Sequence, residues 1–402
     1  MKIGIIREGK VPPDSRVPLI PEQCRVLREE QGMDLVVQAS EVRCFPNDDY
    51  RVAGVPVVAS VDDCDLLLGV KEVPVNELVP AKTYFFFSHT IKEQPYNRKL
   101  LRTILEKDIR LIDYEVLTDD AGMRLIAFGR FAGMVGAHNA MWTYGRRTGM
   151  FSLPRMKDCL DYDAARDAYH RTAFPSCRVV LTGTGRVANG AAEVLDDMGF
   201  HRMAPAEYLS SQRTGPVYTQ LAVCDYAQSR DGSPCTEQTY FLYPERFVSQ
   251  FDRFLGCSHI MINGIYWDPR APAFFTLDEM RAPDFSIQVI ADVTCDIAPD
   301  SSVPSTLRPS TIADPVYGFD PHSGKEAEPF QPGAIDVMAI DNLPNEMPRD
   351  ASEAFGAQFI DRILPELFKE DSAILERATI AHKGKLGVHF AYLEEYVKGN
   401  QS

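Results

Sequence analysis

The stretch RVVLTGTGRVANGAA, residues 178–192, decides the fold class of this chain of 402 residues. Residues 178–182 form an apolar run of the kind found in buried strands. The pattern Gly183-x-Gly185-x-x-Ala188 follows at once, and apolar residues at helical spacing come after it. A strand, a glycine-rich turn and a helix in this order are typical of dinucleotide binding, because the glycines let a pyrophosphate approach backbone N–H groups at the helix N-terminus.

Four residues of this turn are the predicted dinucleotide contacts: Gly183, Gly185, Arg186 and Val187. An acidic residue about 20 positions further on usually holds the ribose hydroxyls. Glu207 is the candidate, at the end of a weak strand predicted over residues 202–209, and it favours NAD over NADP. Arg213 is the counter-argument, because an arginine there could accept a 2′-phosphate. NAD is therefore the expected coenzyme, NADP remains open, and a tight turn without a ligand is the alternative.

Strand and helix patterns alternate before this unit. The strand candidates cover residues 2–6, 34–38, 65–70 and 83–87, and helical patterns begin at 21 and at 97. Such alternation predicts a parallel sheet, in which ligands bind beyond the carboxyl ends of the strands. Lys71 and His89 occupy positions of that kind.

The remaining segments complete two domains. Residues 126–149 read as one buried helix between them, 298–334 as irregular, 350–368 as an amphipathic helix and 372–397 as a helical pair; further strand candidates are 260–264, 287–292 and 337–341. We predict an α/β chain with two Rossmann-like domains, whose parallel sheets are separated by a cleft, and C-terminal helices that return to the first domain. Residues 1–140 plus about 340–402 form the expected substrate and catalytic domain, and about 141–339 the dinucleotide-binding domain.

Composition limits the function. The chain has 42 Lys+Arg and 57 Asp+Glu, a formal net charge of −15, which argues against nucleic acid and anionic membranes as partners. Apolar runs such as 84–87 are too short for a membrane helix, and residues 1–6 are too short for a signal sequence. The nine cysteines include no C-x-x-C pair and the eight histidines no H-E-x-x-H, so we expect free thiols in a reducing cytoplasm and no metal.

Several segments carry unusual polarity: IIREGK (5–10) with SRVPLIPEQC (15–24), GVKEVP (69–74), FFFSHT (85–90) and ADVTCD (291–296). Together they resemble the alanine dehydrogenase, transhydrogenase and saccharopine dehydrogenase superfamily. Two longer segments, YEVLTDDAGMRLIAFGRFAG (114–133) and AIDNLPNEMPRDASEAFG (339–356), are similar to the lysine-forming saccharopine dehydrogenases within it.

The resemblance implies oxidation of saccharopine by NAD, with water, to lysine and 2-oxoglutarate. Lys71 would take the proton from the substrate amine, and His89 would serve hydration and collapse. The implied substrate-binding residues are Arg16, Glu72, Lys92, Glu115, Arg124, Phe128 and Asp341. Asp296, or less readily Asp292, matches a site acid of alanine dehydrogenase and is assigned to the coenzyme side. We expect a basic island within the acidic surface, made of Arg16, Lys71, His89, Lys92, Arg124 and Arg130.

Other activities stay open: alanine dehydrogenase, another opine or imino-acid dehydrogenase, or an NADPH-dependent lysine–oxoglutarate reductase. A non-catalytic nucleotide-binding regulator is a different class of alternative, and the presence of Arg16, Lys71 and His89 argues against it. A metal-dependent hydrolase is disfavoured, because the histidines are dispersed. A monomer and a homo-oligomer are both compatible with the sequence.

Overall fold

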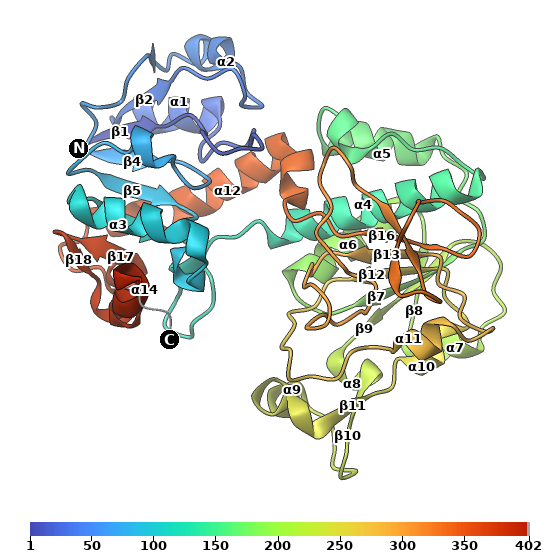
Figure 1. Ribbon diagram of the computed structural model, residues 1–402. Helices are drawn as coiled ribbons and strands as arrows, with labels where there is room; N and C mark the ends of the chain where they lie inside the picture. The colour runs from blue at the N-terminus through green and yellow to red at the C-terminus, as the bar shows by residue number, and fades with distance from the viewer. Residues whose placement is uncertain (400–402) are drawn as a thin grey trace. The chain divides into compact units, whose positions relative to one another are not determined.

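The computed structural model of the protein describes residues 1–399. The chain folds into two compact units: unit 1 is Met1–Phe128 together with the chain from Pro348 onward, and unit 2 is Gly129–Met347. Each unit contains one eight-stranded sheet, covered by helices (Figure 1). The predicted α/β class with two sheets is confirmed.

The sheet of unit 1 has the order β18-β17-β6-β5-β4-β1-β2-β3. Its parallel strands are β1 (Lys2–Ile5), β2 (Asp34–Gln38), β3 (Val57–Val58), β4 (Leu66–Leu68), β5 (Thr83–Phe86) and β6 (Arg110–Asp113). Its helices are α1 (Pro21–Glu29), α2 (Asn47–Val52), α3 (Arg98–Glu106), α12 (Pro348–Arg362), α13 (Ala373–Ala378) and α14 (Glu394–Lys398). Since β1, β4, β5 and β6 are parallel neighbours, their carboxyl ends meet at one edge.

The predicted helical pair over 372–397 is wrong in its middle. Residues 379–386 form an antiparallel hairpin, β17 (Thr379–His382) and β18 (Lys385–Leu386), and β17 pairs with β6. Lys383 and Gly384 have φ values of 51° and 70°, as two-residue hairpin turns require. Ile380 is buried in the core of unit 1, so burial against the sheet outweighs helix propensity.

The sheet of unit 2 has the order β15-β14-β16-β13-β12-β7-β9-β8. Its strands are β7 (Arg178–Thr182), β8 (His201–Met203), β9 (Val217–Leu221), β12 (Ile260–Asn263), β13 (Val289–Asp292), β14 (Tyr317–Asp320), β15 (Lys325–Ala327) and β16 (Ile335–Met338). The strands β14 and β15 are antiparallel additions to a mostly parallel sheet, which corrects the expectation of an irregular segment over 298–334. A separate pair consists of β10 (Ala227–Ser229) and β11 (Phe247–Ser249).

The longer helices of unit 2 are α4 (Gly129–Thr148), α5 (Tyr162–His170) and α6 (Arg186–Asp197). The shorter ones are α7 (Pro205–Ser210), α8 (Val223–Tyr226), α9 (Glu237–Leu242), α10 (Asp252–Leu255) and α11 (Leu277–Met280). Helices α4 and α6 pack with their backbones nearly in contact. A Cβ added to Gly133 of α4 would lie 1.7 Å from the carbonyl oxygen of Val187 in α6, and a Cβ added to Gly190 of α6 would lie 2.1 Å from the carbonyl oxygen of Arg130 in α4. This packing fixes the helix that begins at the glycine-rich turn.

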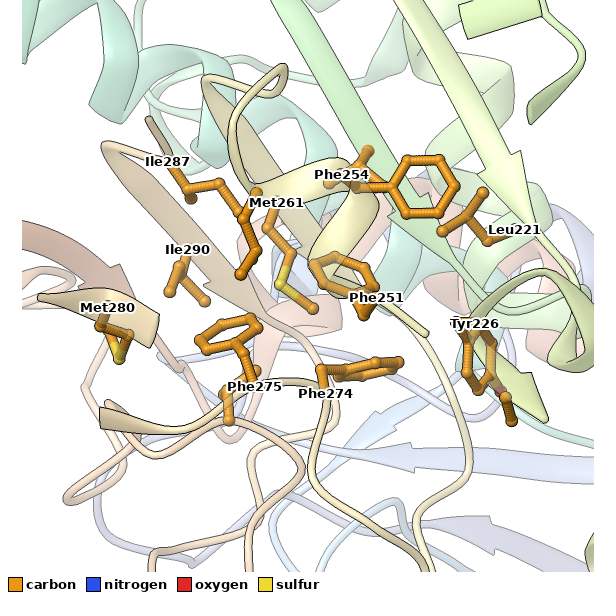
Figure 2. Close-up of a cluster of buried hydrophobic side chains, with 14 of the residues drawn as sticks. Leu221, Tyr226, Phe251, Phe254, Met261, Phe274, Phe275, Met280, Ile287 and Ile290 are labelled. Atoms are coloured by element: carbon orange, nitrogen blue, oxygen red, sulfur yellow. The ribbon is translucent and has the colours of Figure 1, made fainter. Parts of the chain in front are cut away.

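A cluster of buried aromatic and aliphatic side chains supports the sheet of unit 2. Figure 2 shows Phe251, Phe274 and Phe275 gathered beside Met261 of β12 and Ile290 of β13. The ring centroid of Phe251 lies 5.0 Å from that of Phe274 and 5.8 Å from that of Phe275, within the range of favourable aromatic pairs. Val180 of β7, the strand that leads to the glycine-rich turn, belongs to the same buried cluster.

The expectation that every cysteine is a free thiol is wrong. Cys224 and Cys235 form a disulfide, with 5.5 Å between their Cα atoms. Spacing in the sequence did not reveal it, because the pairing depends on how the segment after β9 folds back. The correction also removes the free-thiol argument for a cytoplasmic location. Within residues 1–399, no helix combines the length and apolar character needed to cross a membrane, and no three His, Cys, Asp or Glu side chains are placed to hold a metal ion.

Candidate functional site

Charged side chains follow four neighbouring strands of unit 1 at their carboxyl ends. Glu8 follows β1, Lys71 and Glu72 follow β4, His89 follows β5, and Glu115 follows β6. Neighbouring parallel strands bring these residues to one edge of the sheet. The structure therefore assembles the predicted catalytic pair, Lys71 and His89, at the same place.

Lys71 is half-buried, and no carboxylate of the described residues lies within ion-pair distance of its ammonium. Burial, followed by the positive charges of Arg16 and Lys10, lowers the pKa of Lys71 to about 8. Its backbone N–H and that of Val70 donate to the two carboxylate oxygens of Glu8, at 2.8 and 2.7 Å. Lys71 is thus held in position and has an appreciable neutral fraction near neutral pH.

Glu72 links Lys10 to His89. Its Oε1 lies 2.5 Å from Nδ1 of His89, and its Oε2 forms an ion pair of 2.9 Å with Lys10. Burial raises the pKa of Glu72, but the contacts with His89 and Lys10 outweigh it and bring the pKa to about 2. Glu72 is therefore a carboxylate throughout the physiological range, and it orients the imidazole.

The loop that carries His89 is held by Asp113 of β6. Asp113 accepts hydrogen bonds from the backbone N–H of Ser88, at 2.8 Å, and from its hydroxyl, at 2.5 Å. His89 itself has a left-handed backbone, with a φ of 54°. A non-glycine residue adopts that conformation only where the surroundings enforce it, and such positions cluster at functional sites.

A second charged group lies after β6. Glu115 is paired with Arg124 at 2.9 Å and with Lys92 at 3.5 Å. Both cations are about half exposed, at 46% and 48%, whereas the side chain of Glu115 is 10% exposed. These three predicted substrate-binding residues are brought together, with the cations on the solvent side.

Arg16 is 2% exposed and lies on the face of Phe128, 4.2 Å from the ring centroid. Its Nε and Nη2 donate to the two oxygens of Asp14, at 3.0 and 2.6 Å. Phe128 stacks in turn on Phe355, with centroids 4.5 Å apart. Arg16 is predicted to bind a substrate carboxylate, but the Nε–Nη2 edge of its guanidinium is engaged by Asp14. The ring of Phe128 packs against the face of the same guanidinium.

The predicted basic island is wrong in its charge. Carboxylates pair with most of its cations, so the edge is nearly balanced in charge; these carboxylates are Asp14, Glu72 and Glu115. Arg130 lies at the start of α4 in unit 2 and pairs with Glu193 of α6 at 2.5 Å. The His89–Glu72 and Arg130–Glu193 pairs join segments that are distant in the sequence.

The glycine-rich turn of unit 2 has the geometry that a dinucleotide requires. Gly183 has a φ of +100°, and an added Cβ would lie 2.8 Å from the carbonyl oxygen of Gly264, so only glycine fits. An added Cβ at Gly185 would meet nothing within 4 Å, in the space before α6. The first N–H groups of this helix point toward that space, where a pyrophosphate would be stabilised. Arg186 and Val187, the other predicted contacts, form the first turn of α6.

The predicted strand over 202–209 exists only at its start, as β8, which ends at Met203, so Glu207 is not at its end. Pro205 starts the helix α7 instead, and Glu207 lies within this helix on the protein surface. The strand beside β7 is β9, and β8 lies outside it. The place that usually holds the ribose therefore lies at the carboxyl end of β9. There Gln220 donates to the carbonyl oxygen of Gly183 at 2.9 Å and accepts from Arg202 at 2.6 Å.

Arg213 lies at the wrong edge of the sheet for a 2′-phosphate. It precedes β9, and the nearby Gly215 donates to Ser176, which precedes β7. The glycine-rich turn follows the opposite end of β7, on the order of 15 Å away along a five-residue strand. The assignment of Arg213 to the coenzyme site is therefore withdrawn.

The acids of unit 2 separate into buried and accessible groups. Asp292 is fully buried and accepts hydrogen bonds from Thr306, Asn263 and the backbone N–H of Cys295, at 2.6, 2.8 and 3.3 Å. Burial raises its pKa to about 6. Asp292 is thus part of the framework, whereas Asp296 is half-buried and Asp341 exposed. Both lie near enough to Cys295 to help raise the pKa of its thiol, after burial, to about 12.

Three residues of the site in unit 1 were not predicted: Glu8, Lys10 and Asp14. Burial and the charge of Asp14 raise the pKa of Glu8 to about 8, against the effect of the N–H donors from Val70 and Lys71. A signal was present, since all three lie in the polar segment between β1 and Arg16. The partners of Glu8 and Lys10 lie in the segment after β4, which local sequence does not reveal, whereas Asp14 pairs with the nearby Arg16.

Comparisons with known proteins agree with this architecture. Residues 4–135 match the family described as alanine dehydrogenase/PNT, N-terminal domain. The chain is 27% identical to alpha-aminoadipic semialdehyde synthase of Arabidopsis thaliana, over 99% of this chain and 42% of that protein. It is 26% identical to a lysine-forming, NAD(+)-linked saccharopine dehydrogenase of Emericella nidulans, over 94% and 95% of the two chains.

The chain spans less than half the length of the semialdehyde synthases that it matches. A solved L-alanine dehydrogenase has the same fold, with a TM-score of 0.66, 16% identity and 99% of both chains covered. The resemblance predicted from the sequence is confirmed at this level. Residues 4–135 are thus similar to the alanine dehydrogenase/PNT N-terminal domain, and the fold of the chain is similar to that of a solved L-alanine dehydrogenase.

Proposed function

We propose that this chain is a nicotinamide-dinucleotide-dependent oxidoreductase that oxidises saccharopine, with water, to lysine and 2-oxoglutarate. Unit 1 binds the amino-acid substrate and unit 2 binds the dinucleotide. Saccharopine dehydrogenases from several fungi, with 24 to 26% identity, support the substrate and the NAD. The observation that carries the proposal is the depressed pKa of Lys71 beside the Glu72–His89 pair.

The reaction needs two proton-transfer groups with pKa values near the working pH. A bound NAD would supply the hydride acceptor for the substrate carbon that bears the secondary amine. Lys71, with a pKa of about 8, takes the amine proton in its neutral form. His89 then moves protons as water adds to the imine and as the carbinolamine collapses. Glu72 holds Nδ1 of His89, so Nε2 is the ring nitrogen that exchanges the proton.

Substrate binding uses the outer charges of unit 1. Arg124 and Lys92 are about half exposed and remain able to reach a carboxylate, although both contact Glu115. The substrate carries several carboxylates, and charge-assisted hydrogen bonds from these cations suit them. Glu115 keeps the cations together at the edge. Nε of Arg16 donates to Asp14, so its role in the proposal is electrostatic: its positive charge helps lower the pKa of Lys71.

A second candidate is the reverse reaction, in which lysine and 2-oxoglutarate are joined with NADPH as the reductant. Arg202 favours it. This guanidinium is exposed, bonds to Gln220 near the carboxyl end of β9, and has no carboxylate of the described residues within ion-pair distance. An arginine in that region suits a 2′-phosphate.

A kinetic screen with purified protein separates these functions. Saccharopine with NAD is expected to give NADH, and lysine plus 2-oxoglutarate is tested with NADH and with NADPH. Turnover of pyruvate and ammonia, with none of saccharopine, would identify an alanine dehydrogenase instead. Dinucleotide binding without turnover of any of these substrates would point to a regulator.

A further inference from the structure

The disulfide of unit 2 joins two segments that both contact the glycine-rich turn. Cys224 is in the first turn of α8, four residues after Gln220 of β9. Cys235 directly precedes Thr236, which caps α9. The bond therefore joins the segment that leaves β9 to the start of α9.

Both joined segments contact the turn. Gln220 donates to the carbonyl oxygen of Gly183 at 2.9 Å and to Oδ1 of Asn189 at 3.1 Å. From the other side, the hydroxyl of Thr184, between the two glycines, lies 3.4 Å from a carboxylate oxygen of Glu237 at the start of α9. The disulfide thus links two groups that flank the predicted pyrophosphate site.

The small lobe formed by residues 222–250 has its own aromatic packing. Tyr240 lies edge-on to Tyr226 and to Phe247, with centroids 6.2 and 5.2 Å apart. These contacts tie Tyr240 of α9 to α8 and β11 in addition to the disulfide. Between the two cysteines, residues 230–234 are all exposed. The disulfide therefore restricts where α9 begins.

Cys224 is exposed and Cys235 is half-buried, so a thiol reagent has access to the first sulfur. The other seven cysteines are free thiols, either buried or half-buried. Attack by a thiolate requires an accessible disulfide sulfur. Accessibility and position together distinguish this pair from the remaining cysteines.

We propose that Cys224–Cys235 is a redox modification site that controls dinucleotide binding at the glycine-rich turn; this rests on the proposed function, which places the dinucleotide there. One thiolate of a dithiol reductant attacks Sγ of Cys224, the S–S bond breaks, and Cys235 leaves as a thiolate that takes a proton. The second thiol of the reductant resolves the mixed disulfide and releases Cys224 as a thiol. The protein gains two electrons and two protons, and the reductant becomes a cyclic disulfide.

Reduction weakens binding because it frees the start of α9. Glu237 then no longer has a fixed position against Thr184, and the dinucleotide must order both segments when it binds. The loss of affinity is entropic, and the aromatic packing of the lobe is retained. The oxidised protein is accordingly the high-affinity form.

The test measures NADH and NADPH binding to the full chain by coenzyme fluorescence. One sample is kept oxidised and the other is treated with dithiothreitol and desalted without oxygen. We expect the dissociation constant to rise at least about 5-fold on reduction. The double variant Cys224→Ser/Cys235→Ser is expected to bind weakly with or without reductant. Cys257→Ser, which removes a free half-buried thiol of the same unit, is expected to respond like the wild type.

Equal affinities in the two redox states of the wild type would overturn the inference, whatever the variants do. Alkylation of both Cys224 and Cys235 in protein never exposed to reductant, detected by peptide mass spectrometry, would overturn it as well. Absence of dinucleotide binding in both states would contradict the proposed function itself, and the inference with it.

Discussion

The two sheets have the same plan and differ in what they present at their carboxyl edges. Each has a parallel core and an antiparallel hairpin at one end, β17–β18 in unit 1 and β14–β15 in unit 2. Unit 1 presents titratable side chains, among them Lys71, Glu72 and His89, whereas unit 2 presents the backbone of a glycine-rich turn and keeps Asp292 buried beneath it. One architecture thus serves proton transfer through side chains and binding through the backbone.

The largest expected effect tests whether the edge of unit 1 carries the chemistry. Lys71→Met and His89→Gln, made separately, are each expected to lower kcat by about 10² to 10⁴, because each removes a proton-transfer group. Dinucleotide affinity, measured by fluorescence, is expected to stay the same. Lys99→Met, at an exposed position of α3, is the control. If both variants keep near wild-type turnover with saturating saccharopine and NAD, the assignment is wrong.

The next effect tests whether the acid of unit 2 is structural. The folded-state pKa of Asp292 is about 6, above its ordinary value of 3.8, so the folded state binds the extra proton between these values. The free energy of unfolding should therefore decrease by up to about 3 kcal/mol from this group as the pH rises from 4 to 6.

Asp292→Asn is expected to remove this part of the pH dependence. The measurement is the free energy of unfolding in urea at several pH values between about 4 and 6. The half-buried Asp296 provides the matched control, Asp296→Asn. Should Asp292→Asn instead show the wild-type slope, Asp292 would not be the buried titrating group of unit 2.

A smaller effect tests binding through the backbone. Gly185→Ala and Gly185→Val place one and three carbons in the open space before α6. We expect the dissociation constant of the dinucleotide to rise in that order, at least about tenfold for valine, because a loss of about 1.4 kcal/mol corresponds to that factor. The thermal midpoint of the protein without coenzyme should hardly change. A large drop in that midpoint would contradict the assignment of this space to a ligand.

The smallest effect sharpens the electrostatics of unit 1. In the oxidative direction the rate is expected to rise with pH through about 8, since Lys71 must be neutral. Glu72 raises the pKa of Lys71 and Lys10 lowers it. Glu72→Gln should therefore move the rise to lower pH and Lys10→Met to higher pH, each by less than about one unit. If both variants moved the pH profile of kcat/KM in the same direction, a group other than Lys71 would control that profile.

Local sequence was sufficient for the strands and for the chemistry at their ends. The strand predicted over 34–38 coincides with β2, and those over 2–6 and 83–87 differ from β1 and β5 by one residue. Apolar runs identify buried parallel strands, because both faces of such a sheet are covered. Lys71 and His89 followed from the same rule, since polar residues after such strands lie at the ligand-binding edge.

Local sequence was insufficient wherever distant segments decide the outcome. The hairpins β14–β15 and β17–β18 add to the sheets by antiparallel pairing with β16 and β6, which no periodicity encodes. The place of β9 between β7 and β8 moved the expected ribose site away from Glu207. The Cys224–Cys235 bond likewise depends on how the chain turns after β9.

The sequence by itself determined the α/β class, the glycine-rich turn and the two proton-transfer candidates, because each follows from neighbouring residues and short-range geometry. Only the tertiary structure decided which distant charges pair, since His89 meets Glu72 and Arg130 meets Glu193. It also decided the order of the strands in each sheet. The physical reason is that pairing and strand order are set by burial and long-range contacts, which a local pattern of residues does not specify.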